Sequence, residues 1–139
     1  MKVVICGAGQ VGTSIAQHLA GENNDVTVID QDAALVRKIT ETLDVRGVHG
    51  LASLPSILEG AGTRDADMLI AVTYSDEVNM VACQVAHSLF NVPLRIARIR
   101  QQDYLQPLWA DLFSRENMPI DHIISPEREV AKAIGRRLQ

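Results

Sequence analysis

The sequence predicts a single α/β domain with a doubly wound parallel sheet, on two observations. Short apolar runs alternate with segments of helical periodicity along all 139 residues, as in successive βαβ units. Six such runs occur, and six strands in this rhythm fit the order 3-2-1-4-5-6, with helices on both faces of the sheet. This is the Rossmann-like arrangement, and the length suits one domain spanning 1–139.

The first half of the chain contains three expected strands and three expected helices. In chain order they are strand Lys2–Cys6, helix Gln10–Glu22, strand Asp25–Asp30, helix Asp32–Leu43, strand Val45–His49 and helix Ser53–Ala61. The first strand is a short β-branched run that stops at a glycine. Apolar residues in the helices recur at three- and four-residue spacing, as Val11, Ile15 and Leu19 do in the first.

The second half repeats the alternation. In chain order it has strand Asp67–Thr73, helix Asp76–Phe90, strand Pro93–Ile99, helix Gln102–Ser114, strand Pro119–Ile124 and a final helix opened by Ser125-Pro126. The run at 67–73 is nearly all apolar, which suits a central strand buried on both faces. The helix at 76–90 carries Val78, Val81, Val85 and Leu89 on one face, and Pro107 interrupts the helix at 102–114.

The composition excludes several function classes. Aromatic residues make up 4% of the chain and the net charge is -4, so a nucleic-acid-binding surface is not expected. Two cysteines, Cys6 and Cys83, lie inside apolar runs, which argues against a disulfide framework and indicates a reducing, intracellular compartment. No apolar stretch reaches the roughly 18 residues that a membrane span requires.

A glycine-rich loop follows the first strand. Gly7, Gly9 and Gly12 occupy the positions of G-x-G-x-x-G, where they allow a tight turn, the approach of a pyrophosphate and close packing of the helix. The N-terminus of the following helix would offer N–H groups and partial positive charge to the phosphates. Asp30, at the end of the second strand, is placed to accept hydrogen bonds from ribose hydroxyls. The alternative is that the glycines only form a turn and Asp30 caps the second helix.

Asp30 also predicts which nucleotide binds. Its carboxylate would repel a 2′-phosphate, and neither Gln31 nor Asp32 supplies a cation, so NAD(H) or an adenosine di- or triphosphate is favoured over NADP(H). Ligands of this fold lie at the carboxyl ends of the strands. Thr73 ends the fourth strand there, and it could bond a ribose or a phosphate.

Two arginines follow at the end of the fifth strand. Arg98 and Arg100 are two residues apart, so they could face the same side and reach phosphate charge. Arg98 is the stronger candidate because it is nearer the sheet. A solvated strand end is the alternative for these arginines, and a plain strand-end polar residue is the alternative for Thr73.

No catalytic or metal-binding constellation is recognisable. His18, His49, His87 and His122 fall on different elements, and the CxxC, HExxH, G-x-S-x-G and P-loop patterns are absent. The six strands use the whole chain and leave no substrate domain. The sequence therefore predicts a nucleotide-binding protein that is not an enzyme. Two alternatives stay open: the nucleotide-binding domain of an NAD-dependent oxidoreductase, and a methyltransferase that uses S-adenosylmethionine.

Several runs resemble the RCK/KTN family, and within it the N-terminal half-domain of the TrkA branch. These runs are Ala66–Thr73, Ser75–Gln84, Ser88–Phe90, Ile96–Arg100 and Ile120–Glu127, and the likeness spans 1–139. The resemblance implies a cytoplasmic regulatory subunit, peripheral on the inner face of the cell membrane, that gates a Trk-type potassium transporter in response to nucleotides. It also implies dimers and tetrameric rings, and a longer parent protein with a second, similar half.

The same resemblance implies a set of nucleotide-binding residues. NAD(H), or ATP or ADP, would be held by Gly7, Ala8, Gly9, Gln10, Val11 and Asp30, and completed by Thr73, Tyr74 and Arg98. One departure lies after the third strand, where RCK/KTN sequences usually read Gly-Asp-Ala or Gly-Asn-Ala and the middle side chain helps to fix the adenine. This chain has Gly50-Leu51-Ala52, and Leu51 can pack against a base but cannot hydrogen-bond it.

Overall fold

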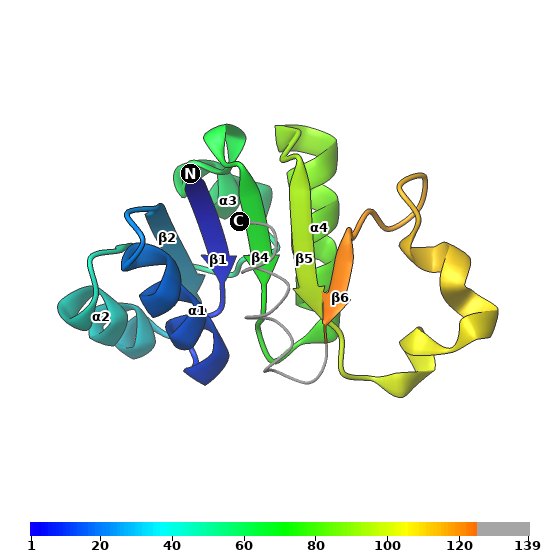
Figure 1. Cartoon of the computed structure of the whole chain (residues 1–139), viewed down its shortest axis with the longest axis horizontal. Helices are drawn as coiled ribbons and strands as arrows, with labels where there is room; N and C mark the ends of the chain where they lie inside the picture. The colour runs from blue at the N-terminus through cyan, green and yellow to red at the C-terminus, as the bar shows by residue number, and fades with distance from the viewer. Residues whose placement is uncertain (125–139) are drawn as a thin grey trace.

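The computed structural model of the chain describes residues 1–124 and contains a six-stranded sheet of order β3-β2-β1-β4-β5-β6 (Figure 1). Its strands are β1 (Lys2–Cys6), β2 (Asp25–Asp30), β3 (Arg46–His49), β4 (Met68–Ala71), β5 (Leu94–Arg98) and β6 (His122–Ile124). Every neighbouring pair is parallel. The predicted strands, their order and the fold class are confirmed, and the helix predicted to open at Ser125-Pro126 lies outside the described residues.

Four α-helices connect these strands. They are α1 (Gln10–Ala20), α2 (Ala33–Thr42), α3 (Pro55–Gly60) and α4 (Asp76–Phe90), and a short 3₁₀ helix, η1 (Thr63–Asp65), follows α3. Asp32 caps α2 by accepting from the Ala34 N–H, and Ser75 caps α4 by accepting from the Val78 N–H. No helix in the described part of the chain is long and apolar enough to cross a membrane.

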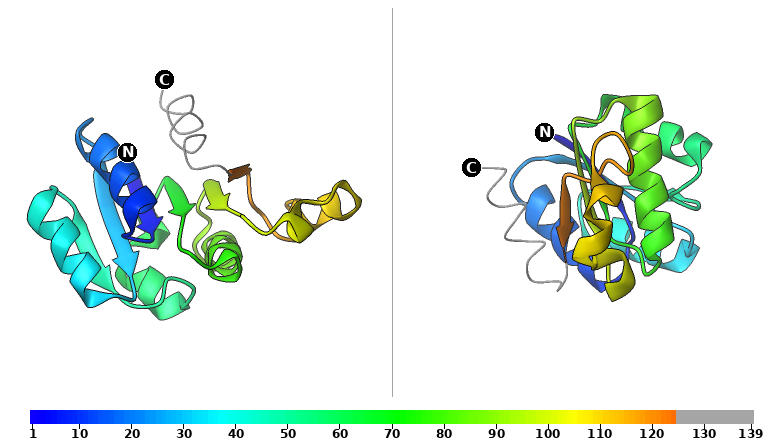
Figure 2. Two further views of the ribbon diagram at one scale, coloured as in Figure 1. Left: turned by 90° about the horizontal axis from the view of Figure 1, so that it is seen from below. Right: turned by 90° about the vertical axis from the view of Figure 1, so that its right-hand side faces the viewer.

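The helices form layers on both faces of the sheet, and Figure 2 shows α1 and α4 on opposite sides of it. Side chains alternate along each strand, so Val3 and Ile5 pack with α1 while Val4 and Cys6 pack with α3 and α4. The central strand β4 is fully buried, as expected for a parallel strand covered on both faces. This sandwich fixes the carboxyl ends of β1, β2, β4 and β5 at one edge.

The apolar face predicted for α4 is only partly covered. Val81 is 43% exposed and Leu89 is 50% exposed, while Val78 and Val85 are half-buried. The sheet is contacted instead by a second stripe of α4, made of Asn79, Met80, Ala82, Cys83, Ala86 and Phe90. The helix therefore has a second apolar face, of which Val78 and Val85 pack at the margin of the core while Val81 and Leu89 stay exposed in the described part of the chain.

The connection from β5 to β6 differs from the predicted α-helix over Gln102–Ser114. The structure has two 3₁₀ helices, η2 (Gln102–Leu105) and η3 (Pro107–Phe113), which extend beyond the edge of the sheet (Figures 1 and 2). Gln106 is extended, with φ -62° and ψ 134°, because the residue before a proline is sterically excluded from the helical region. Tyr104 Oη donates to Glu77 Oε2 at 2.8 Å and so ties η2 to α4.

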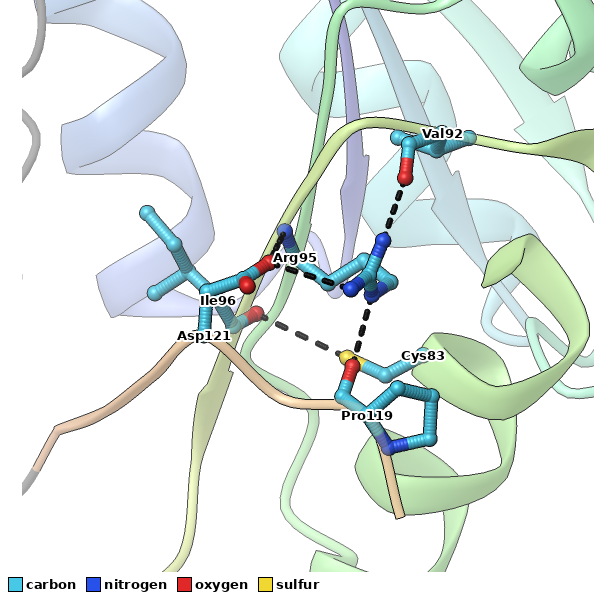
Figure 3. Close-up of polar contacts among 6 residues, drawn as sticks. All are labelled: Cys83, Val92, Arg95, Ile96, Pro119 and Asp121. Atoms are coloured by element: carbon cyan, nitrogen blue, oxygen red, sulfur yellow. Dashed lines mark hydrogen bonds and ion pairs between the residues drawn. The ribbon is translucent and has the colours of Figure 1, made fainter. Parts of the chain in front are cut away.

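A buried arginine holds β6 to the sheet (Figure 3). Arg95 is 3% exposed; its Nε donates to the Pro119 carbonyl at 2.6 Å, and its Nη1 donates to the Val92 carbonyl. Asp121 Oδ2 accepts from the Arg95 backbone N–H at 2.8 Å and lies 3.4 Å from Arg95 Nη2. The guanidinium thus satisfies carbonyl groups that precede β5 and β6, and it orders the segment before β6.

Candidate functional site

A cleft of about 440 Å³ opens at the carboxyl edge of the sheet, around the point where β1 and β4 lie side by side. Ligands of doubly wound folds bind at this place. All but two of the predicted site residues line it: Gly7, Gly9, Gln10, Val11, Asp30, Leu51, Ala52, Thr73, Tyr74 and Arg98. The other two residues of that set, Ala8 and Gly12, are not part of the lining, and neither is Arg100.

The glycine loop is shaped by contacts within the fold. Gly7 has φ +115°, and a Cβ there would lie 2.9 Å from the Val72 carbonyl oxygen. A Cβ on Gly12 would overlap the Gly7 carbonyl oxygen. The first and third glycines of the motif are therefore required by the turn itself.

The N-terminus of α1 differs from those of α2 and α4. No side chain caps α1. Asp32 and Ser75 directly precede α2 and α4, and their side-chain oxygens accept from N–H groups of the first turn. The first-turn N–H groups of α1 keep their capacity to donate to an anion, and the helix dipole adds about half a positive charge.

Asp30 lies beside this helix end. Its Oδ2 accepts from the Ala8 N–H at 2.8 Å, and its Oδ1 accepts from the Asp32 N–H at 2.7 Å. The cap of α2 is Asp32, whose Oδ1 accepts from the Ala34 N–H at 2.9 Å, so Asp30 does not have the helix-capping role that was its alternative. A carboxylate oxygen can accept more than one hydrogen bond, so both oxygens of Asp30 keep acceptor capacity for ligand hydroxyls.

Asn79, which the sequence analysis did not single out, joins the ends of β4 and β5. It is fully buried, and its Oδ1 accepts from the Thr73 N–H at 2.9 Å and from Thr73 Oγ1 at 2.7 Å. Its Nδ2 donates to the carbonyls of Thr73 at 3.2 Å and Arg98 at 2.8 Å. The sequence does carry a signal for Asn79, because its polar amide lies at helical spacing from Cys83 and Ala86, on the face of α4 that is otherwise apolar.

The Thr73 hydroxyl is engaged within the protein. It donates its single proton to Asn79 and accepts from the Ser75 N–H at 3.2 Å. One acceptor lone pair remains for a ligand hydroxyl, and no proton remains for a phosphate. Thr73 is thereby suited to a ribose contact rather than to a phosphate contact.

Two arginines border the loop between β4 and α4. Arg98 is 2% exposed and its Nη2 donates to the Thr73 carbonyl at 3.3 Å, so it is not the solvated strand end that was its alternative. Arg100 is exposed, and its Nη2 donates to the Tyr74 carbonyl at 3.3 Å. The Asp76 carboxylate accepts from the N–H groups of Arg100 and Gln101, which fixes the turn after β5.

The opposite wall of the cleft is apolar. Leu51 and Ala52 follow β3, and Ile29 and Leu35 contribute from β2 and α2. Such a wall can pack against the flat face of a base. It contains Leu51 at the position where the resembled family usually has an acid or an amide.

The two cysteines lie in the core and not at the cleft. Cys6 and Cys83 are free and buried, and burial raises the pKa of Cys6 to about 12 and also raises the pKa of Cys83. Within residues 1–124, no three His, Cys, Asp or Glu side chains are grouped so that they could hold a metal ion. His18 pairs on the surface with Glu22 at 3.4 Å.

In a comparison with known protein families, residues 3–126 of the chain match the TrkA-N domain. The chain belongs to the TrkA-N domain family. Among curated relatives of this TrkA-N domain, it is 61% identical over 138 residues to the Trk system potassium uptake protein TrkA of Azorhizobium caulinodans. It is 53% identical over 139 residues to the protein of the same name from Halomonas elongata. The matches cover 99% and 100% of the chain but only 30% of each relative.

Solved structures of low sequence identity share the fold of this TrkA-N domain. The TrkA-N domain of the inner membrane protein YbaL from Escherichia coli superposes with a TM-score of 0.77 at 22% identity, covering 99% of this chain and 96% of that one. The GsuK channel bound to NAD superposes with a TM-score of 0.73 at 18% sequence identity, and the match covers 96% of this chain and 23% of that one. The Shewanella denitrificans Kef C-terminal domain in its AMP-bound form superposes with a TM-score of 0.73 at 17% sequence identity, and the match covers 99% of this chain and 79% of that one.

Proposed function

We propose that this TrkA-N domain binds an adenine nucleotide and acts as a regulatory part of a Trk-type potassium uptake system. The ligands in question are NAD(H), ATP and ADP. One observation carries the proposal: the uncapped N-terminus of α1 and the carboxylate of Asp30 face the same cleft, joined by the Ala8 N–H bond to Asp30. A donor cluster for phosphates and an acceptor for ribose hydroxyls are thus adjacent.

Each wall of the cleft has a part in this proposal. The diphosphate would contact the first turn of α1, where Gln10 and Val11 lie, and Arg98 would add a positive charge. The ribose would be held by Asp30 and by the free lone pair of Thr73. The base would pack on Leu51 and Ala52 without a side-chain hydrogen bond from Leu51.

Names of similar proteins support the regulatory part of the proposal. The curated relatives are Trk system potassium uptake proteins, and two proteins of the same fold are described with bound NAD or AMP. The nucleotide would act by binding two arrangements of the assembled protein with different affinity, a coupling that is typically about 1–3 kcal/mol. The domain would lie in the cytoplasm against the membrane subunit of the transporter.

The outward face of α4 supports self-association. Val81 and Leu89 are exposed on this face. Ser75 and Val78, at the start of the same helix, line the cleft, so the helix connects the face to the candidate site. We propose that a second copy of the chain packs on this face, as a step towards the dimers and rings expected above. Val81→Glu should reduce the assembly measured by light scattering, whereas Leu54→Glu, an exposed leucine before α3, should not. Equal masses for both variants and the wild type would contradict this interface.

Calorimetric titration tests the nucleotide site. NADH and ATP should bind the wild-type chain, and Asp30→Ala should weaken both by at least tenfold. Asp25→Ala is the matched control because Asp25 is exposed at the opposite end of β2. NADPH should bind more weakly than NADH. Equal affinity of the wild type and Asp30→Ala would contradict the assigned ribose contact.

The regulatory role is tested in the full-length protein. Potassium uptake by a reconstituted Trk-type transporter should respond to NADH or ATP when the wild-type protein is present. Asp30→Ala should remove that response, and Asp25→Ala should retain it. If potassium uptake still responded to NADH or ATP with the Asp30→Ala protein, nucleotide binding at this cleft would not control transport, and the regulatory role would be contradicted.

A further inference from the structure

The side chain of Tyr74 lies over the glycine loop. The residue is 72% exposed, and a Cβ placed on Gly9 would lie 3.3 Å from Tyr74 Oη and 3.6 and 3.7 Å from two of its ring carbons. The ring is flanked by two cations, because the guanidinium carbons of Arg98 and Arg100 are each 5.8 Å from its centroid. An aromatic ring thus occupies the open side of the middle glycine of the motif.

This position matters for a ligand with two linked phosphates. A side chain is missing at the middle glycine of such loops so that a pyrophosphate can approach the backbone. The Tyr74 ring and a diphosphate would therefore compete for the same side of Gly9. They would also compete for Arg98, which borders both the ring and the cleft.

We propose that Tyr74 is a displaceable plug on the nucleotide site, which the diphosphate of an incoming nucleotide moves away from Gly9. The proposal rests on the function proposed above. In place of the binding role that the family resemblance implies for Tyr74, the proposal makes it a residue that lowers affinity for diphosphate ligands and so sets the concentration at which the site fills.

The contacts of the ring are of a kind that a phosphate can replace. A cation–π contact at an exposed site changes an equilibrium by roughly two- to fivefold, whereas a guanidinium paired with phosphate makes charge-assisted hydrogen bonds. The two arginines are held by backbone carbonyls of Thr73 and Tyr74, not by the ring alone. They can keep their positions while the ring moves.

Affinity measurements on the full chain test the plug. Tyr74→Ala should bind ADP about fivefold more tightly than the wild type, while adenosine, which has no phosphate, should bind both with equal affinity. Tyr74→Phe keeps the ring and should stay near the wild-type affinity for ADP. Tyr104→Phe is the matched control, because its hydroxyl bonds Glu77 outside the cleft.

The movement of the ring can be observed directly. The chain has two tyrosines, so ring-labelled tyrosine gives two NMR signals, one from Tyr74 and one from Tyr104 as an internal reference. Addition of ADP should shift the Tyr74 signal and leave that of Tyr104 in place. Adenosine should shift the Tyr74 signal much less.

The outcomes separate the plug from the nucleotide site. Tighter ADP binding by Tyr74→Ala, with a shifted ring signal, supports the plug. Weaker or unchanged ADP binding by Tyr74→Ala, with binding still dependent on Asp30, overturns the plug and leaves the nucleotide site standing. A loss of ADP affinity in Tyr74→Phe would show that the hydroxyl is a phosphate ligand, which also overturns it. Failure of both wild type and Tyr74→Ala to bind ADP or NADH overturns both proposals.

Discussion

Asn79 accepts two hydrogen bonds from Thr73, one from its backbone N–H at 2.9 Å and one from its hydroxyl at 2.7 Å. The same amide donates to the carbonyl of Arg98, so a single buried side chain of α4 sets the relative positions of two cleft residues. The geometry of this wall therefore depends on a residue that does not line the cleft. Its substitution gives the first prediction.

Asn79→Ala should lower the free energy of unfolding by about 2–4 kcal/mol. The substitution removes the acceptor of the Thr73 N–H and a buried donor to the Arg98 carbonyl, and loss of the partner of a buried polar group costs about 1–3 kcal/mol. Gln84→Ala is the control on the same helix, since the Gln84 amide bonds only near the surface to Ser88. Urea denaturation measures both variants, and similar midpoints for the two would contradict the role of Asn79.

Gly12→Ala should destabilise the fold by about 3 kcal/mol or prevent folding. The added Cβ would overlap the Gly7 carbonyl, and backbone at that place cannot move without disturbing the turn. Gly60→Ala is the matched control because nothing lies within 4 Å of its Cβ position at the end of α3. Removing a helical glycine should make that variant equal to the wild type or about 0.5–1 kcal/mol more stable. Thermal unfolding of a Gly12→Ala protein at the wild-type temperature would refute the predicted overlap.

Arg95→Leu should cost about 3–5 kcal/mol of stability. The change removes the donor for the Pro119 and Val92 carbonyls and leaves Asp121 without its buried cation. Glu59→Gln is the control, because it breaks an ion pair with Arg64 in which both side chains are more than 60% exposed. It should change the free energy of unfolding by less than about 1 kcal/mol. Amide hydrogen exchange should also show faster exchange in β6 of Arg95→Leu. Unchanged protection of β6 would contradict the assigned role.

The buried thiols predict a loss of stability in alkali. The pKa of Cys6 is raised by burial to about 12, from an ordinary value of 9.0. Below pH 9 the thiol is protonated in both states and its protonation contributes no pH dependence. Between about pH 9 and 12 only the unfolded state releases the proton, so stability falls as the pH rises.

The Cys6→Ala variant isolates this effect. From pH 8 to about pH 10.5, the wild type should lose about 2 kcal/mol more unfolding free energy than Cys6→Ala. Other alkaline titrations and that of Cys83 are common to both proteins and cancel in the comparison. Parallel stability curves for the two proteins would show that the Cys6 thiolate forms as easily in the folded state as in the unfolded one.

Local patterns were sufficient to predict the sheet. Strand β1 is a β-branched run that stops at Gly7, and β4 is apolar throughout because helices cover both of its faces. The segment at 102–113 shows the limit of periodicity. Apolar residues there recur as in a helix, but Pro107 and the extended Gln106 divide it into 3₁₀ turns. Periodicity also could not tell which apolar face of α4 meets the sheet, because both faces have helical spacing.

The candidate site was predictable at positions where the residue type itself indicates a single structural or binding role. Glycines at fixed spacing and an acid at the next strand end identified Gly7, Gly12 and Asp30 as neighbours. Asn79 and Asp76 were missed because each also bonds backbone groups after or at the end of β5, which come close only when β4 and β5 pair. The Tyr74 position over Gly9 depends on loop geometry that no spacing rule encodes.

The clash between a Cβ on Gly12 and the Gly7 carbonyl has an evolutionary consequence. A descendant of this domain that lost its ligand would still need both of those glycines in order to fold. Gly9 is under no such backbone constraint, since the three atoms nearest to a Cβ added there all belong to the side chain of Tyr74. Under the proposed function, homologues that retain the outer two glycines but have replaced the middle one should keep this architecture without a diphosphate site.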